Sequence, residues 1–188
     1  MQRIALARFM IVPAISTLIF LGCGKGTRGL VQNSEAKSSS GWAMKITDSS
    51  QPSTVKVKAR SLYGGTQPER DESPPANQKW VLLSAELSPP AAAASLPVKQ
   101  IKLAEATNSY AALAISDASD KGAPAFVYFK ESAGLAQVSA SGQMLWAIMR
   151  NDNTGEIDLI FQKAGSEKVF FLFAVPAAAT NLTLQLSP

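Results

Sequence analysis

Apolar and polar residues alternate with a period of two along most of the chain from Trp42 onward. In the clearest case, Val55 and Val57 alternate with Lys56 and Lys58. Successive side chains of a β-strand point to opposite faces, so this period is typical of a strand with one buried face. Similar runs predict further strands at 42–47, 79–88, 98–103, 110–115, 125–129, 144–149, 157–162, 169–175 and 182–186.

Turn residues separate nearly every pair of these runs, for example Pro74-Pro75 and Pro89-Pro90, and no segment carries a long apolar stripe at helical spacing. Eight to ten short strands predict an all-β fold, an immunoglobulin-like sandwich of two antiparallel sheets, with a β-barrel as the alternative. The segment 169–175 is apolar on both faces, which places it at the centre of a sheet.

The first 22 residues have the features of a secretory signal peptide. Arg3 and Arg8 are their only charged residues, and residues 9–22 are largely apolar with one interruption at Pro13. A transmembrane helix needs about 20 apolar residues, so this stretch is short for a membrane anchor. A basic start, a short apolar segment and a small residue at the end are the parts of a signal peptide.

The string Phe20-Leu21-Gly22-Cys23 resembles the lipobox of bacterial lipoproteins. The resemblance implies cleavage after Gly22, a diacylglyceryl group on Cys23, and acylation of the new amino terminus, as with palmitate. Because each buried methylene contributes about 0.8 kcal/mol, two or three acyl chains would hold the protein on a lipid bilayer. Gly24 rather than aspartate follows the cysteine, which favours the outer membrane in a host with two membranes. The alternatives are an unmodified cysteine after a plain signal peptide, or an uncleaved anchor.

Residues 24–41 are polar, rich in glycine and serine, and without periodicity. This composition predicts a flexible tether with a mean reach of about 20–25 Å. The expected organisation is therefore a signal peptide at 1–22, a lipidated cysteine and tether at 23–41, and a β-sandwich domain at 42–188.

The end of the chain resembles the closing strands of certain bacterial lipoprotein domains. The strand 157–161, the turn Gly165-Ser166-Glu167, the segment 171–176 ending in Val-Pro, and the strand 182–186 carry this likeness. The family consists of the telokin-like, immunoglobulin-like "immunoprotective extracellular" domains, and segments 79–87 and 101–114 are similar to its middle strands. The resemblance implies an immunoglobulin-like fold and transfers no catalytic residues, because the family is mostly of unknown function.

The composition excludes several kinds of chemistry. The chain has no histidine and a single cysteine. A Ser-His or Cys-His nucleophile pair, an imidazole metal ligand and an intrachain disulfide are therefore impossible. Without residues 1–22 the chain keeps 16 basic and 14 acidic residues. The net charge of +2 is too small to favour nucleic-acid binding. We expect no cofactor.

Three acidic residues, Glu69, Asp71 and Glu72, lie close enough in sequence to serve as paired carboxylates in glycoside hydrolysis. They share the proline-rich segment 67–78, which we expect to be a solvated loop. Such a loop would not hold the carboxylates in a fixed geometry, so the segment favours a surface role.

Two further motifs have simpler interpretations. Ser-x-x-Lys occurs at Ser34–Lys37 and Ser53–Lys56, but these positions fall in the predicted tether and at a strand start, not on a helix as in penicillin-binding enzymes. The segment Asn151–Asp158 has oxygen-bearing side chains at several positions, as calcium loops do, yet Asn, Asp and Gly are also typical of a tight hairpin. The hairpin is the favoured interpretation, and calcium binding remains open.

The aromatic residues mostly indicate a core. The three tryptophans lie within predicted strands, where aromatic residues usually pack inside; they are Trp42, Trp80 and Trp146. Tyr63 instead precedes the flexible pair Gly64-Gly65. We predict an exposed ligand contact at Tyr63, Gly64 and Gly65.

Together these features favour a lipid-anchored protein of the bacterial cell envelope that acts as a non-catalytic binding or structural module for an envelope protein, glycan or polymer. One alternative is an envelope hydrolase that uses carboxylates without histidine, which requires two or more acidic residues in one partly buried cleft. The other is a small-ligand carrier, which requires a cavity of at least about 300 Å³ between the sheets.

Overall fold

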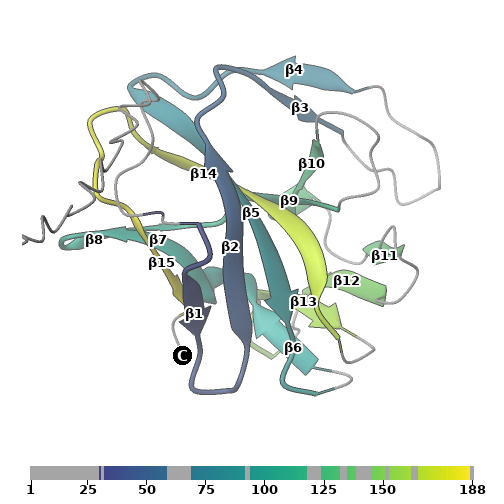
Figure 1. The fold of residues 1–188 in the computed structure, drawn as a ribbon. Helices are drawn as coiled ribbons and strands as arrows, with labels where there is room; N and C mark the ends of the chain where they lie inside the picture. The colour runs from purple at the N-terminus through teal and green to yellow at the C-terminus, as the bar shows by residue number, and fades with distance from the viewer. Residues whose placement is uncertain are drawn as a thin grey trace, which may run out of the picture.

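The computed structural model describes residues 30, 32–58, 69–91, 94–117, 124–131, 135–138, 145–150, 153–161 and 165–186. Within these ranges the regular elements are strands, apart from the short 3-10 helices η1 (Val98–Gln100) and η2 (Phe129–Glu131). No helix in the same ranges is long and apolar enough to span a membrane. The chain is an all-β sandwich, as the period-two pattern predicts (Figure 1).

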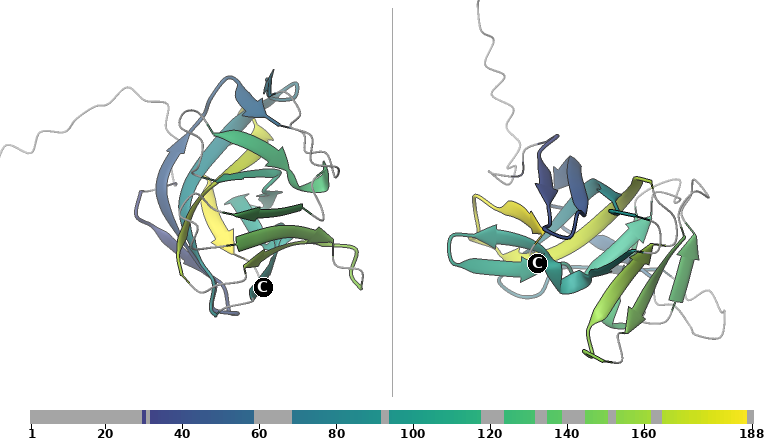
Figure 2. Two further views of the ribbon diagram at one scale, coloured as in Figure 1. Left: turned by 90° about the vertical axis from the view of Figure 1, so that its right-hand side faces the viewer. Right: turned by 90° about the horizontal axis from the view of Figure 1, so that it is seen from below.

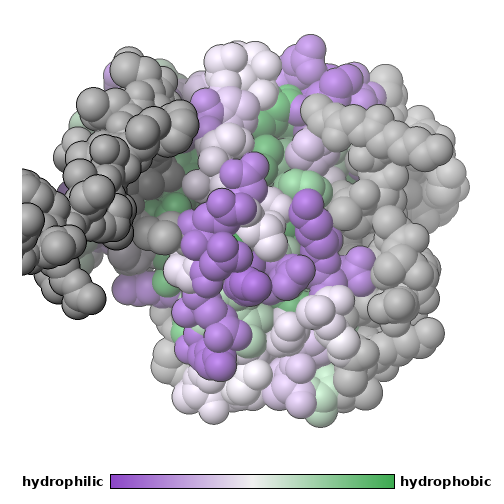
Figure 3. Space-filling model, in the orientation of Figure 1, coloured by the Kyte–Doolittle hydropathy of each residue, from purple (hydrophilic) through white to green (hydrophobic). Residues whose placement is uncertain are grey.

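One layer of the sandwich is a large eight-stranded sheet. Its strands in spatial order are β1 (Glu35–Lys37), β2 (Ala43–Ser50), β5 (Gln78–Ser88), β14 (Glu167–Pro176), β9 (Ala114–Asp117), β10 (Ala125–Tyr128), β3 (Val55–Val57) and β4 (Arg70–Glu72). Neighbouring strands are antiparallel except β10 and β3, which are parallel. The outward surface over β1 and β2 is hydrophilic, and Lys37 and Lys45 are exposed there (Figure 3).

The other layer consists of two smaller antiparallel sheets, where we expected a single sheet. The four-stranded sheet has the order β11 (Leu135–Val138), β12 (Leu145–Arg150), β13 (Ile157–Phe161) and β6 (Ala94–Pro97), and the three-stranded sheet has the order β15 (Thr183–Leu186), β7 (Ile101–Glu105) and β8 (Asn108–Ala111). Leu96, Leu103 and Phe161 from these sheets join the main core with residues of the large sheet. Figure 2 shows the arrangement from two further sides.

The large sheet carries a hydrophobic core on each face. Along β14, Phe171 and Phe173 belong to the main core, whereas Leu172 belongs to a second cluster with Trp80 and Phe126. Since successive strand side chains point to opposite faces, the central part of β14, residues 169–175, must be apolar at every position to fill both clusters. The segment 169–175 is therefore central, as its sequence predicts, and it pairs with β5 on one side and β9 on the other.

The large sheet curves around this second core. The indole Nε1 of Trp80 on β5 donates a hydrogen bond to the backbone oxygen of Glu72 on β4 over 3.2 Å. Four strands lie between β5 and β4 in the sheet order, so a flat sheet would hold these two residues far apart. The bond therefore requires the sheet to curl back toward its own middle.

The folded domain begins earlier than the predicted boundary at Trp42. Residues 35–37, which we placed in the tether, form β1, with Ala36 opposite Met44 of β2. Leu30 is also buried and packs into the main core. With three residues, of which one is apolar, β1 is too short to show an alternating pattern in the sequence. Its pairing with β2 holds it in place.

Two predicted strands are interrupted in the structure. The segment 98–103 begins with the single turn η1 before β7, and the segment 110–115 is divided between β8 and β9 at Ala112-Leu113. At this division the chain leaves the three-stranded sheet and enters the large sheet. The alternation predicts strand on both sides of the division but does not reveal that the two halves pair with different partners.

We predict that Phe171→Ala lowers the free energy of unfolding by about 3–5 kcal/mol, because it opens a cavity in the main core. Phe170→Ala is the matched control, since Phe170 is the adjacent residue on the opposite face and is only partly buried. Equilibrium urea unfolding measures both variants. Equal losses in the two variants would contradict the assignment of the deeper core to the Phe171 face.

Candidate functional site

A pocket of about 450 Å³ lies where the large sheet meets both smaller sheets. Its apolar lining consists of Val98, Ala111, Ala112, Leu113, Phe129 and Ile157. Its polar lining consists of Arg70, Glu72, Lys99, Tyr128, Lys130 and Glu156. Because all three sheets contribute, the pocket depends on the assembled sandwich rather than on any one loop.

The chain crossing at Ala112-Leu113 joins the three-stranded sheet to the large sheet beside the pocket. The Ala112 amide donates to the backbone oxygen of Ile101 on β7 over 3.0 Å, and the Leu113 amide donates to that of Leu172 on β14 over 2.8 Å. The carbonyl of Leu113 in turn accepts a 3.0 Å hydrogen bond from the amide of Phe129. These three bonds fix the backbone that carries most of the apolar wall.

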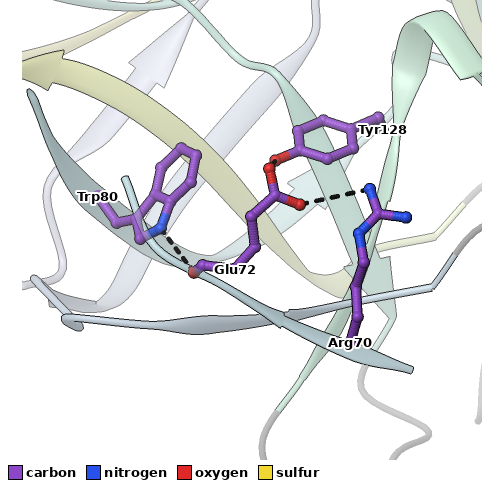
Figure 4. A network of polar contacts seen from close by, with 4 residues as sticks. All are labelled: Arg70, Glu72, Trp80 and Tyr128. Carbon is purple, nitrogen blue, oxygen red and sulfur yellow. Dashed lines mark hydrogen bonds and ion pairs between the residues drawn. The ribbon is translucent and has the colours of Figure 1, made fainter. Parts of the chain in front are cut away.

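Glu72 is the centre of a polar network on the large-sheet side of the pocket (Figure 4). Its Oε1 accepts a 2.9 Å hydrogen bond from the hydroxyl of Tyr128, and its Oε2 lies 3.5 Å from Nη2 of Arg70. With the indole bond from Trp80 to its backbone oxygen, Glu72 is held at both ends. The carboxylate is thus fixed in position on the short edge strand β4.

A second ion pair comes from the smaller sheets. Lys99 of η1 pairs with Oε1 of Glu156, which lies just before β13. Both acidic side chains are partly exposed, at 34% for Glu72 and 32% for Glu156. The pocket therefore has two charged pairs, each contributed by a different part of the sandwich.

The predicted acidic cluster is divided by the structure. Arg70–Glu72 forms β4, which pairs with β3, so the expectation of a solvated loop is wrong for these three residues. Glu69 is exposed and pairs with Lys56 over 3.4 Å, while Asp71 lines a smaller hollow of about 200 Å³. Glu72 lines the larger pocket, and the other carboxylate of that lining is Glu156, not Glu69 or Asp71.

The segment Asn151–Asp158 connects two paired strands, as the hairpin interpretation predicts. Arg150 and Ile157 are opposite each other in the antiparallel pair β12–β13, and Gly155 has a φ of 68°, which suits glycine. Asp158 accepts a 2.9 Å hydrogen bond from the Ser95 hydroxyl. Within the described ranges no group of three or more His, Cys, Asp or Glu side chains is placed to hold a metal ion.

The tryptophans that can be described are core residues, as predicted. Trp42 and Trp80 are each 1% exposed, and the ring of Trp42 meets that of Phe161 edge-on at 5.2 Å. Of the two Ser-x-x-Lys matches, neither is on a helix: Ser34 precedes β1 and Ser53 precedes β3. Lys56 of the second match instead pairs with Glu69.

Several predicted site residues lie outside the described residues. These are Cys23, the proposed contact Tyr63, Gly64 and Gly65, and Asn151 and Asp152 of the hairpin loop. The structure brings together a different set, in which Lys99 and Lys130 had no sequence signal that singled them out.

Known proteins provide no family for this chain. No protein-family model matches it, and no curated protein sequence matches it. The crystal structure of an uncharacterized β-sandwich protein from Clostridium difficile 630 aligns over 81% of this chain and 80% of its own, at 13% identity and a TM-score of 0.38. A likeness this distant carries no functional argument, so function must be argued from the residues themselves.

We predict that Tyr128→Phe lowers the free energy of unfolding by about 0.5–1.5 kcal/mol, since it removes a hydrogen bond to a partly exposed carboxylate. Chemical denaturation measures the change. Tyr110→Phe is the matched control, because Tyr110 is also partly buried and packs against the core. The effect of Tyr128→Phe should shrink in a Glu72→Ala background, and equal effects in both backgrounds would contradict the network.

Proposed function

We propose that this protein is a lipid-anchored, non-catalytic binding module of the bacterial cell envelope, and that the pocket of about 450 Å³ is its ligand site. The anchor rests on the string Phe20-Leu21-Gly22-Cys23, which follows a basic start and an apolar segment. The closing strands 157–186 favour membership of the immunoglobulin-like, immunoprotective extracellular domains. The outer membrane is the proposed location where the host has two membranes.

The single observation that carries the binding role is the pocket itself. Pockets that take small molecules have volumes of about 300–1,000 Å³ and combine apolar walls with a few fixed polar groups. This pocket has that size and composition, and the Tyr128–Glu72–Arg70 network supplies polar groups in a fixed geometry. Of the binding roles considered from the sequence, a small-ligand carrier therefore gains the most support.

The hydrolase alternative has one observation in its favour, because Glu72 and Glu156 both line the same partly buried pocket. Each of these carboxylates, however, is engaged by a cation, Glu72 by Arg70 and Glu156 by Lys99. A general acid must give up a proton and a nucleophile must approach the substrate with a free oxygen. Two carboxylates that are each paired with a cation suit ligand binding better than the role of a general acid or of a nucleophile.

We predict that Cys23→Ser abolishes labelling with fatty acid, and that no form of the variant is both processed to the mature size and bound to the membrane. Without the diacylglyceryl group no acyl chain would hold the protein on the bilayer. Membrane fractionation of the producing cells and metabolic labelling with a fatty acid measure the two effects. A membrane-bound, processed Cys23→Ser protein would show that the anchor is not at this cysteine.

We also predict that the neutral apolar dye N-phenyl-1-naphthylamine binds the mature chain, residues 23–188 with Cys23→Ser, and gains fluorescence. Every described residue lies within this chain. Ala111→Trp places a large side chain into the pocket from an exposed position of β8 and should reduce dye affinity at least tenfold. Fluorescence titration measures the affinity.

Ala177→Trp is the control for the dye experiment, because Ala177 is also an exposed alanine and lies outside the pocket lining. It should leave dye binding unchanged. If Ala111→Trp and Ala177→Trp bind the dye equally well, the pocket is not the binding site.

A further inference from the structure

We infer that the pocket binds a small single-chain or aromatic amphiphile with one anionic group, and that Lys130 is the residue that selects the anion. This inference rests on the proposed binding function and adds the chemical class of the ligand. Three observations lead to it: the apolar walls, the charges of the lining, and the position of exposed Lys130 next to buried Phe129.

The walls accommodate an apolar body. Ala111 and Ala112 are consecutive small residues, and Leu113 next to them is the large apolar side chain that remains exposed among the described residues, at 36%. Val98 of η1, Phe129 of η2 and Ile157 of β13 complete the wall. When a ligand covers exposed apolar surface at the mouth of a pocket, the burial of that surface stabilises the complex.

The charges of the lining favour one negative group. Glu72 is matched by Arg70, and Glu156 is matched by Lys99, so these four residues contribute no net charge. Lys130 of η2 also lines the pocket and is exposed, and no described carboxylate forms an ion pair with it. The lining therefore carries a net charge of +1, which an anionic ligand would neutralise.

Other ligand classes fit less well. A cationic amphiphile would face the excess charge of Lys130 and would have to displace Arg70 or Lys99 from its carboxylate. A neutral sugar needs several hydrogen-bonding groups, but the Tyr128 hydroxyl and the Glu72 carboxylate already bond to each other. A two-chain phospholipid is too large for a pocket of about 450 Å³, which lies in the lower half of the small-molecule range.

The position of Lys130 also suggests how the ligand lies. Phe129 is buried and Lys130, the next residue of η2, is exposed, so the two side chains offer an apolar floor beside a charged rim. We place the apolar body of the ligand against Phe129, Ala111 and Ala112, with its anionic group at the opening near Lys130.

The test compares two ligands of equal chain length, decanoate and decanol, as competitors of N-phenyl-1-naphthylamine on residues 23–188 with Cys23→Ser. Decanoate is ionised at pH 7 and decanol is neutral. We expect both to displace the dye. Lys130→Met should weaken decanoate about three- to tenfold, as for a charge-assisted contact at a solvent-accessible rim, and leave decanol within about twofold.

Lys45→Met is the matched control, since Lys45 is an exposed lysine of β2 outside the pocket, and it should change neither affinity. Lys130→Glu should weaken decanoate further than Lys130→Met does. Equal effects of Lys130→Met on both ligands, or no effect on decanoate, would overturn the inference. Dye binding that neither ligand displaces would overturn it too, yet leave the proposed binding function standing, whereas absence of dye binding to the pocket would refute that function itself.

Discussion

The burial of β14 on both faces is the constraint on which the rest of the structure depends. Its odd-numbered residues, such as Phe171 and Phe173, fill the main core, while Leu172 fills the second cluster with Trp80. A strand that is apolar on both faces must be covered on both. The two smaller sheets cover one face, and on the other the large sheet curls over itself, fastened by the bond from Trp80 to Glu72. The same curl brings β4 and its carboxylate to the pocket.

The pocket follows from the way in which the second layer is divided. A single continuous sheet would close over the main core, but here two small sheets meet the large one separately, and the chain crosses between layers at Ala112-Leu113. Polar side chains gather where the three sheets meet: Tyr128 of β10 reaches Glu72, and Lys99 of η1 reaches Glu156. Each pair links segments more than fifty positions apart, so the site forms only once the sandwich is assembled.

The sequence predicts the long strands well because their alternation records which face is buried. The segments 79–88 and 169–175 are examples, and the hairpin around Gly155 follows from its turn residues. The sequence does not predict β1 and β4, whose residues Glu35–Lys37 and Arg70–Glu72 are mostly polar and which depend on bonds to distant partners. For the same reason it named Glu72 as a loop residue and offered no sign of Lys130. The alternation of apolar and polar residues records which positions are buried, whereas this pocket is formed by contacts between segments that are distant in the sequence.

The burial of Leu30 sets a geometric limit that differs from the tether first expected from the sequence. Seven peptide units separate Cys23 from Leu30, and even a fully extended chain of that length spans only about 25 Å. With Cys23 held in a bilayer, Leu30 and the core around it would stay within about 25 Å of that anchor point. The rate at which the domain meets a ligand would then depend on the density of that ligand at the membrane surface rather than on its concentration in solution. A ligand that leaves or enters the membrane would meet the pocket far more often than one dissolved in the surrounding fluid.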